Sequence, residues 1–349
     1  MPLLPPKSEV ETKPILRKCI EARSALAELK IAGQLIPNQS VLINTIPLLE
    51  AKDSSELENI VTTTDNLFRF AFDSVQQRPD SATKEALRYR ASLHEGFRSL
   101  ADKPLSVATA VRVCSAIKGS PMELRKVPGA ALANHQSKKV IYTPPVGEAV
   151  IREKLSNWEK FLHSETELDP LIRMAIGHYQ FEAIHPFLDG NGRTGRVLNL
   201  LYLIQENLLH QPILSLSHYI LANKSNYYTL LFGVTEKQDW ESWILYMLEG
   251  VRLMSGWTTK KVIAIQRLME HTTNYIRQKL PKIYSRELVD ILFFQPYCRI
   301  NNLVENGIVK RETASNYLKS LAKLGVLDER KSGRDKIFAH PKLLELLTS

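Results

Sequence analysis

The chain has 349 residues, enough for two or three domains of about 100–200 residues each. Hydrophobic residues make up 44% and charged residues 24%, which excludes a disordered, collagen-like, coiled-coil or disulfide-scaffold protein. The excess of 46 basic over 37 acidic residues gives a net charge of +9, which favours anionic partners without naming one. Cys19, Cys114 and Cys298 are widely spaced and form no CxxC motif, which argues against disulfides and cysteine-zinc sites and favours a reducing compartment.

The hydropathy pattern gives no sign of secretion or of a membrane span. Residues 2–7 lack a continuous apolar run and do not resemble a signal peptide. The most apolar stretch, residues 198–220, is interrupted by a polar cluster that begins at Gln205, so it is too polar to cross a bilayer. We therefore expect a cytoplasmic protein that does not associate with membranes.

The first of three expected regions, residues 1–103, is helical in pattern. Apolar residues recur at helical spacing from Ile15 to Leu100. Residues that favour helix caps predict helix starts near 53–55 and near 63–65.

The second expected region, residues 104–257, is a helical core interrupted by one β-prone segment. Prolines and glycines between residues 119 and 147 break helices, and the run at 139–142 predicts a hairpin or flap. Helical patterning resumes at 150–184, breaks at His-Pro, and returns at 191–254.

The third expected region, residues 258–349, contains a small separate domain. Its pattern predicts helices at 285–294, 300–306 and 310–324, followed by a two-stranded wing at 326–330 and 336–339. The run Thr-Ala-Ser-Asn-Tyr-Leu at 313–318 resembles the exposed helix of winged helix-turn-helix folds.

The most informative segment is residues 185–196, His-Pro-Phe-Leu-Asp-Gly-Asn-Gly-Arg-Thr-Gly-Arg. Gly190 and Gly192 permit positive φ and a close approach of the backbone to a ligand. A helix that begins here would point free N–H groups and the positive end of its dipole at that ligand. Arg193 and Arg196 share a face of the first turn. Together these features predict an anion site.

Two side chains beside this site suit phosphate chemistry. Asp189 is a hard oxygen ligand for Mg²⁺ that phosphates carry. His185, four residues earlier, has the pKa range of a general base. A base, a metal-binding carboxylate and a phosphate site within twelve residues indicate transfer chemistry on a nucleotide.

Each feature alone also has a structural explanation. The spacing Gly190-x-Gly192-x-x-Gly195 matches the dinucleotide fingerprint, but that motif follows a buried strand, and residues 171–183 are helical in pattern. A single histidine before a proline is usually structural, and paired arginines usually lie on a solvated face. Their joint occurrence in this order favours the nucleotide site.

The segment resembles the Fic-family signature His-Pro-Phe-x-(Asp/Glu)-Gly-Asn-Gly-Arg-x-x-Arg and matches it at every defined position. The resemblance implies a mainly α fold, with a Fic-type helical core, a small β-hairpin flap and the C-terminal winged-helix-like domain. It also implies a protein adenylyltransferase, which transfers AMP from ATP to a Ser, Thr or Tyr hydroxyl of a target protein and releases pyrophosphate.

The resemblance assigns roles to matching positions. His185 would deprotonate the target hydroxyl, and Asp189 would hold Mg²⁺ on the α- and β-phosphates of ATP. Arg193 would bind phosphate, Arg196 would reach the γ-phosphate, and Phe187 would anchor the loop in the core. The other implied ATP-binding residues are Gly190, Asn191, Gly192, Thr194 and Gly195.

One position separates two chemistries within the superfamily. Doc-type members, which act as kinases, carry Lys where this chain has Gly192. The glycine therefore favours transfer of AMP over transfer of phosphate. Some Fic members use UTP or other diphosphate donors, so the preference for ATP is implied by the resemblance alone.

A second motif lies N-terminal to the signature. Residues 54–59, Ser-Ser-Glu-Leu-Glu-Asn, fit the inhibitory-helix motif (Ser/Thr)-x-x-x-Glu-(Gly/Asn) of Fic proteins. The alternative is an ordinary helix start, because Ser55 and Glu58 would form a capping box. Since the Fic signature is present, we favour an inhibitory helix near residues 53–62.

The inhibitory residues on this interpretation are Ser54, Glu58 and Asn59. The Glu58 carboxylate is expected to form a bidentate pair with Arg196. That pair would occupy the donor needed by the γ-phosphate, which predicts an enzyme that inhibits itself.

Two further segments are assigned with alternatives open. Residues 138–145 lie where Fic proteins place the flap that aligns the target by β-strand addition, and a plain connecting hairpin is the alternative. Tyr228 lies at a spacing where related proteins have an aromatic residue near the adenine, although aromatic residues at helical spacing are more often core.

Two other functions remain open from the sequence. The same residues could remove AMP from a modified target, with Glu58 positioning a water molecule. Residues 281–349 carry 12 basic and 8 acidic residues, so a DNA-binding regulator acting through the winged helix is the alternative from another class. The expected partners are therefore ATP and a target protein, which could be the chain itself, with DNA and a second copy as alternatives.

Overall fold

Helices form most of this computed structural model, which describes residues 2–36, 38–71, 78–128, 132–133, 140–164, 167–332 and 335–348. The helices of the N-terminal region are α1 (Lys13–Ala32), α2 (Ser40–Leu57), α3 (Thr64–Phe70) and α4 (Ser81–Ser99). The prediction of a mainly helical stretch from Ile15 to Leu100 is confirmed. The predicted start near 63–65 is also confirmed, since the Thr63 side chain caps α3 by accepting from the Asn66 N–H at 3.1 Å.

The predicted helix start near residues 53–55 is wrong. These residues lie in the last turns of α2, which begins thirteen residues before Asp53. They are cap-type residues, but their side chains bind tertiary partners instead of local N–H groups. Asp53 accepts from His218 at 2.9 Å, and Ser54 accepts from an arginine in the predicted anion site. Local cap preference therefore misplaced the helix start.

The central region adds helices around one short hairpin. The elements are α5 (Val107–Lys118), β1 (Leu132–Ala133), β2 (Val140–Tyr142), α6 (Glu148–His163), α7 (Pro170–Ile184), α8 (Asn191–Gln205), α9 (Leu216–Ala222), α10 (Lys224–Lys237) and α11 (Trp240–Lys279). Strands β1 and β2 pair antiparallel, with Leu132 opposite Tyr142. The predicted hairpin is confirmed in its described residues. Residues 138 and 139 of the expected flap lie outside them.

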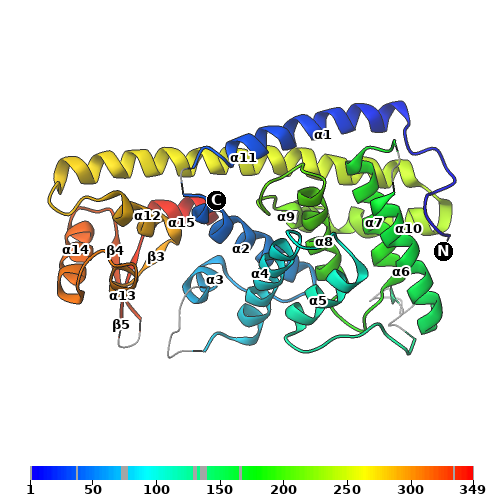
Figure 1. Ribbon diagram of the computed structural model, residues 1–349, viewed down its shortest axis with the longest axis horizontal. Coiled ribbons are helices and arrows are strands. Elements are labelled where there is room, and N and C mark those ends of the chain that lie inside the picture. The colour runs from blue at the N-terminus through cyan, green and yellow to red at the C-terminus, as the bar shows by residue number, and fades with distance from the viewer. Residues whose placement is uncertain are drawn as a thin grey trace.

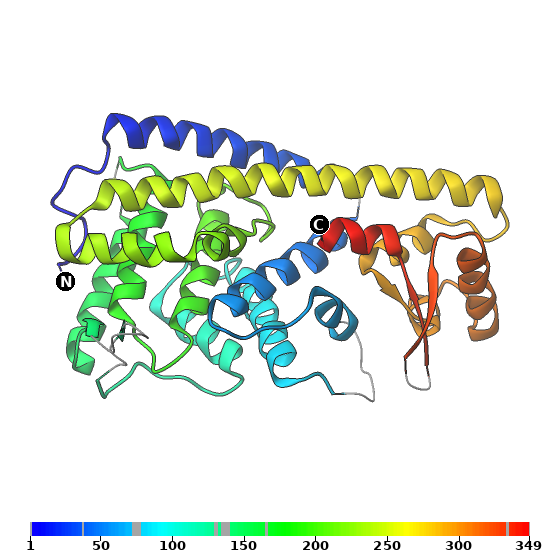
Figure 2. The ribbon, with the colours of Figure 1, turned by 180° about the vertical axis from the view of Figure 1, so that it is seen from behind.

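The long helix α11 runs along one edge of the molecule beside α1 (Figure 1), and Figure 2 shows the same pair from behind. Helix α1 buries one stripe of side chains at helical spacing: Ile15, Cys19, Ala22, Leu26 and Leu29. Helix α11 continues without a break through the predicted boundary between residues 257 and 258. A continuous helix at this position neither fixes nor rules out a domain limit there, so the domain limits stay predictions. None of the helices in the described part of the chain combines the length and the apolarity needed to cross a membrane.

The C-terminal region lies beneath the far end of α11 (Figure 1). Its elements are α12 (Arg286–Phe294), β3 (Tyr297–Cys298), α13 (Ile300–Glu305), α14 (Arg311–Lys323), β4 (Asp328–Ser332), β5 (Asp335–Ala339) and α15 (Pro341–Thr348). The three predicted helices and the two-stranded hairpin are confirmed. Strand β3 adds to the hairpin in the order β3-β5-β4. With only two residues, it is too short to show an alternating pattern in the sequence.

Helix α7 lies at the centre of the core. Nearly every residue from Leu171 to Ile184 is buried, so the helix is surrounded by protein on all sides. It packs against α6, α8 and α11. The segment between α7 and α8, residues 185–190, carries most of the predicted chemistry and is therefore held between two buried helices.

Candidate active site

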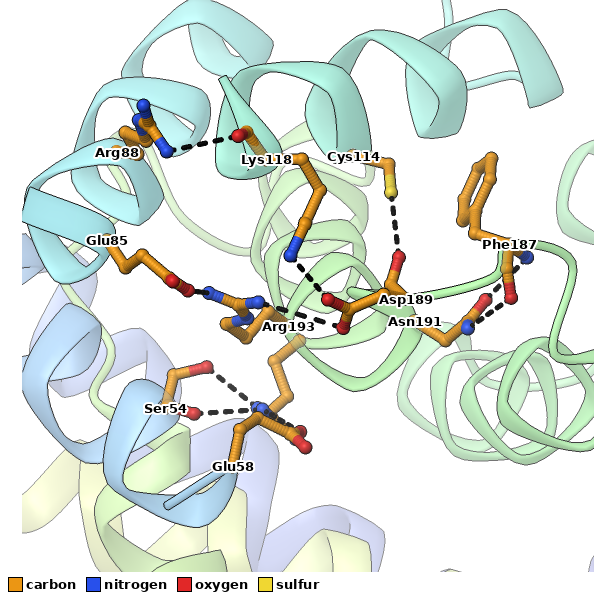
Figure 3. A network of polar contacts seen from close by, with 11 residues as sticks. Ser54, Glu58, Glu85, Arg88, Cys114, Lys118, Phe187, Asp189, Asn191 and Arg193 are labelled. Carbon is orange, nitrogen blue, oxygen red and sulfur yellow. Dashed lines mark hydrogen bonds and ion pairs between the residues drawn. The ribbon is translucent and has the colours of Figure 1, made fainter. Parts of the chain in front are cut away.

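The segment between α7 and α8 is fixed at both ends. Helix α7 ends where His185 adopts a left-handed conformation, φ 50° and ψ 59°, and Pro186 cannot continue the helix. Phe187 is fully buried, as expected of the loop's anchor. The Asn191 amide accepts from the Phe187 N–H and donates to the Phe187 carbonyl, both at 2.8 Å (Figure 3). Asn191 thus uses its side chain to hold the loop.

Helix α8 begins at Asn191, as the sequence predicted. Its N-cap, Gly190, has φ 86°, a conformation that glycine adopts without the steric cost of a Cβ. The N–H groups of the first turn have no acceptor within the helix, so they and the helix dipole favour an anion here. Thr194 is fully buried, and a Cβ on Gly195 would meet Phe181 of α7 at 3.3 Å. These two positions pack α8 against α7, and their role in ATP binding stays a prediction.

Arg196 lies in the second turn of α8 and binds the end of α2. Its Nη2 donates to Glu58 Oε1 at 2.8 Å and to the Ser54 carbonyl at 2.9 Å. Its Nε donates to Ser54 Oγ at 2.8 Å. The expected bidentate Glu58–Arg196 pair is therefore wrong in detail: Glu58 accepts one hydrogen bond, because Ser54 occupies the Nε side of the guanidinium.

The end of α2 explains the last position of the motif. The Asn59 N–H donates to the Glu56 carbonyl and the Ile60 N–H to the Ser55 carbonyl, both at 3.0 Å. This pair of bonds is a Schellman motif, which needs a left-handed residue at the position after the cap. Asn59 has φ 62°, so Gly or Asn is required there. The turn ends the helix at Leu57 with Glu58 as its C-cap and directs Glu58 toward α8, so the expected extension of the helix to residue 62 is wrong.

Close approach of Glu58 to α8 depends on Gly192. A Cβ at that position would lie 2.4 Å from Glu58 Oε1 and 3.0 Å from Arg196 Nη1. The absent side chain therefore leaves space over the first turn of α8 that the Glu58 carboxylate occupies in this structure. The same space is where the helix N-terminus would receive a phosphate.

Electrostatics keep this pair charged. Burial by itself would raise the pKa of Glu58, but the charge and hydrogen bond of Arg196, with Arg193 and Lys224 nearby, lower it overall. Burial opposes the charged form of Arg196, and the Glu58 carboxylate more than offsets it, so the pKa of Arg196 is raised. Glu58 and Arg196 therefore form an ion pair at neutral pH.

Replacing Glu58 with Gln should lower the free energy of unfolding by about 1–2 kcal/mol at pH 7, because buried Arg196 loses its charged partner. The loss is limited because the Glu58 side chain is partly exposed and solvent screens the ion pair. The folded pKa of Glu58 is lowered, so its contribution is present above the unfolded pKa of about 4.3 and is lost as the pH falls through the folded pKa. Urea unfolding of both proteins between about pH 7 and pH 3, a range that extends below the unfolded pKa, measures this. A difference that stays constant below pH 5 would contradict the pairing.

The two remaining charged groups of the signature also have partners from the same chain. Arg193 Nη1 donates to Glu85 Oε2 on α4 at 2.8 Å. Lys118 at the end of α5 donates to Asp189 Oδ2, as Figure 3 shows. Burial would raise the pKa of Asp189, but the hydrogen bond and charge of Lys118 lower it. Arg193 and Asp189 are therefore each paired with an internal counter-ion, and their roles toward phosphate and Mg²⁺ stay predictions.

His185 is half-buried and has the protonation state of a base. Burial lowers its pKa from 6.5, and the charge of Arg125 acts in the same direction. The imidazole is therefore neutral at physiological pH and can accept a proton.

Glu182, one turn before His185, is a second carboxyl group near Arg196. Burial raises its pKa to about 7, and Arg196 only partly offsets this. Its Oε1 is buried without a hydrogen-bond partner and lies 2.5 Å from where a Cβ on Gly195 would be. Gly195 therefore makes room for a carboxyl group that sequence reasoning did not select.

Tyr228 lies on α10 and is 42% exposed. Burial of its hydroxyl, then the charge of Glu58, raise the pKa of Tyr228 to about 12, so it borders the Glu58 side of the site. Its neighbour Tyr227 is buried and bonds His178 at 2.8 Å, which makes Tyr227 core and leaves Tyr228 as the accessible aromatic. Contact with adenine stays a prediction.

A magnesium ion fits the residues present only if phosphates supply most of its ligands. The described residues contain no group of three or more His, Cys, Asp or Glu side chains that could hold a metal. Asp189 offers one carboxylate, 61% exposed, beside the phosphate site. Mg²⁺ commonly binds through one carboxylate plus substrate phosphates and waters. The ion pair between Asp189 and Lys118 would have to open before Asp189 could bind the ion.

The structure thus brings together the signature residues and the motif at residues 54–59, which are 138 positions apart at Glu58 and Arg196. Sequence reasoning missed Glu85 and Lys118. Neither belongs to a motif, and their partners are 108 and 71 positions away. No local signal could have found them.

Three family models match this chain. Residues 16–98 match the Fic/DOC family N-terminal model and residues 112–203 the Fic/DOC family model, which together cover half of the chain. Residues 268–343 match the C-terminal domain of SoFic-like protein adenylyltransferase.

Curated relatives match this chain over short segments. Protein adenylyltransferase fic-1 of Caenorhabditis elegans is 45% identical over 56 residues, which are 16% of this chain and 11% of that protein. A probable protein adenylyltransferase of Aquifex aeolicus is 37% identical over 79 residues, 23% of this chain and 24% of that protein. The matches span no more than a quarter of these relatives' length.

Solved structures share the fold across most of the chain. A Fic family protein from Desulfovibrio desulfuricans aligns with a TM-score of 0.59 and 17% identity over 96% of this chain and 98% of that one. Fic-1 from C. elegans aligns with a TM-score of 0.52 and 17% identity over 73% and 74%. The mainly helical fold predicted from the sequence is therefore confirmed.

Proposed function

We propose, from the premise that this chain belongs to the Fic/DOC family, that it is a nucleotidyltransferase that moves AMP from ATP to a hydroxyl group of a target protein. We also propose that Glu58 holds the enzyme in an inhibited state through its pair with Arg196. We further propose that it acts in the cytoplasm and that it modifies itself when no other target is present.

One observation carries the proposal: a neutral histidine, a carboxylate and two buried arginines surround the N-terminus of α8. Arg193 and Arg196 are 2% and 3% exposed, and most buried cations are paired with an anion. Each is now satisfied by a glutamate, Glu85 or Glu58. A triphosphate can replace both carboxylates, because it brings charged oxygens to the same guanidinium groups.

The transfer step follows from these positions. His185 accepts the proton of the target hydroxyl as its oxygen forms a bond to the α-phosphorus. The bond from the α-phosphorus to the bridging oxygen breaks, and pyrophosphate leaves with the electron pair. The helix N-terminus and Arg193 stabilise the negative charge that develops on the phosphate oxygens. Asp189 would hold Mg²⁺, which supplies charge neutralisation on the phosphates when it is bound.

Glu58 opposes this step in two ways. Its carboxylate uses the Arg196 donor that the γ-phosphate needs, and its negative charge lies over Gly192 where the phosphates must approach. ATP that binds beside it is therefore expected to be held in an unreactive position. In the alternative functions, the C-terminal region would serve as a DNA-binding or dimerisation module, and its 12 basic and 8 acidic residues favour an anionic partner only weakly.

The test is incubation of the purified chain with Mg²⁺ and ATP radiolabelled at the α-phosphate, followed by electrophoresis. Self-modification supplies the readout without a known target. Label on the chain, abolished by a chelator, supports the proposal. If ATP binds but no label appears even after Glu58 is replaced, transfer of AMP to the chain is contradicted. Release of AMP from a pre-modified chain would instead identify the reverse reaction.

A further inference from the structure

Three carbonyl groups at the end of α7 are bound by side chains from outside the helix. The last carbonyls of a helix have no N–H donors in the helix itself, and here Pro186 adds no N–H. Tyr142 of β2 donates from its hydroxyl to the Ala183 carbonyl at 2.6 Å. Arg125 donates from Nη2 to the Ile184 carbonyl at 3.1 Å and from Nε to the His185 carbonyl at 2.7 Å.

The same guanidinium reaches both ends of the β1–β2 hairpin. Arg125 Nη1 donates to the Val127 carbonyl at 3.3 Å, before the hairpin, and Nη2 to the Pro145 carbonyl at 2.6 Å, after it. The backbone N–H of Arg125 also donates to the Pro186 carbonyl at 2.9 Å. One side chain therefore joins the two ends of the hairpin to the residue that carries the base.

The chemistry of this contact is unusual for a buried arginine. Arg125 is 2% exposed, and each of its four acceptors is a backbone carbonyl. A buried charge is costly without a counter-ion, and burial lowers the pKa of Arg125. The planar guanidinium with five donors can serve several carbonyls at fixed angles, which neither a lysine nor an apolar side chain can do.

We infer that Arg125 is a positioning residue that sets the hairpin relative to His185, so that a hydroxyl presented along the hairpin meets the base. This inference rests on the proposed function. Arg125 contacts the loop before α8 but none of the N–H groups or arginines that would hold phosphates. Loss of Arg125 should therefore impair transfer while leaving nucleotide binding intact, since misplacement by about 1 Å can cost about 100-fold in rate.

The experiment uses the Glu58→Gly chain as parent and adds Arg125→Met, Arg125→Lys or Tyr142→Phe. Two quantities are measured: the affinity for ATP by calorimetry, and the rate of self-labelling at saturating ATP. For Arg125→Met we expect ATP affinity within about threefold of the parent and a rate about 100-fold lower. Arg125→Lys keeps the charge and part of the contact, so its rate should recover about tenfold relative to Arg125→Met.

Arg173→Met is the matched control. Arg173 is 9% exposed and also binds the carbonyls at a helix end, donating to the Ser164 carbonyl at 3.0 Å after α6. Among the described residues, its side chain has polar contacts with Leu162, Ser164 and Glu206, and not with the hairpin or residues 185–190. Arg173→Met should be less stable than its parent, because it also loses a buried arginine, but it should keep the parent's rate of self-labelling per folded molecule.

Hydrogen exchange of the same proteins decides the inference independently of activity. Arg125→Met should speed exchange in residues 140–147 and 185–190 and leave the first turn of α8 unchanged, whereas Arg173→Met should not. A parental rate in Arg125→Met, equal loss of ATP affinity and rate, or unchanged exchange at both segments would overturn the inference. A parent that carries no label contradicts the proposed function instead, and the exchange result still confirms or refutes the contact's role.

Discussion

The Glu58→Gly chain should label itself with AMP about 100-fold faster than the wild type, because one hydrogen-bond donor at a charged transition state contributes about that factor to the rate. In the wild type, Arg196 donates hydrogen bonds from Nη2 to Glu58 and from Nε to Ser54. Nη2 also donates to the Ser54 carbonyl, so removing the carboxylate frees one of its two N–H groups for the γ-phosphate and removes the negative charge over Gly192. The rate of self-labelling from ATP labelled at the α-phosphate measures the effect.

Glu56→Gly is the matched control for this prediction. The Glu56 and Glu58 side chains are equally exposed, at 35%, and Glu56 pairs with Lys52 one turn earlier on the same helix. Glu56 lies inside α2 and Glu58 is its C-cap, so glycine should weaken the helix at least as much in the control as in Glu58→Gly. Glu56→Gly should therefore resemble the wild type. Equal rates in Glu58→Gly and the wild type, or equal gains in both variants, would remove Glu58 as the specific inhibitor.

Replacing His185 with Ala in the Glu58→Gly background should lower the labelling rate by about 10²–10⁴-fold, the usual contribution of a general base. The affinity for ATP should stay within about threefold, because the phosphates are held by α8 and its arginines. His163→Ala, at the end of α6, serves as a control histidine. Loss of ATP binding in step with the rate would show that His185 holds the loop together and is not the base.

The pH profile gives a second readout for the same residue. Burial and Arg125 lower the pKa of His185 below 6.5, and only the neutral imidazole accepts a proton. The labelling rate should therefore rise with pH through a midpoint below 6.5 and stay level above it. A midpoint above 7 would contradict this assignment.

The signature loop could be predicted in detail because its information is local. Helix termination at His185, the helix start at Asn191 and the left-handed Gly190 follow from a proline, a glycine and their neighbours. The family resemblance then placed Glu58 against Arg196. It could not predict that Ser54 takes the other side of the guanidinium, because that depends on how α2 crosses α8.

The rest of the site depends on contacts that no local pattern encodes. The start of α2 was misplaced because Asp53 and Ser54 favour helix caps, yet here they bind residues of α9 and α8. The Arg193–Glu85 pair and the Arg125 contact with His185 join residues 108 and 60 positions apart. Only the packing of α4, α5 and α7 around α8 brings them together.

The most direct test of the account compares two labels in one protein. The Glu58→Gly chain is incubated with Mg²⁺ and ATP that is radiolabelled at either the α- or the γ-phosphate, and His185→Ala is added as the inactive form. Transfer of the α-label alone, absent in His185→Ala, is the predicted result, because the α-phosphorus is attacked and pyrophosphate leaves. Transfer of the γ-label, or no transfer of either label by a chain that binds ATP, would contradict adenylylation.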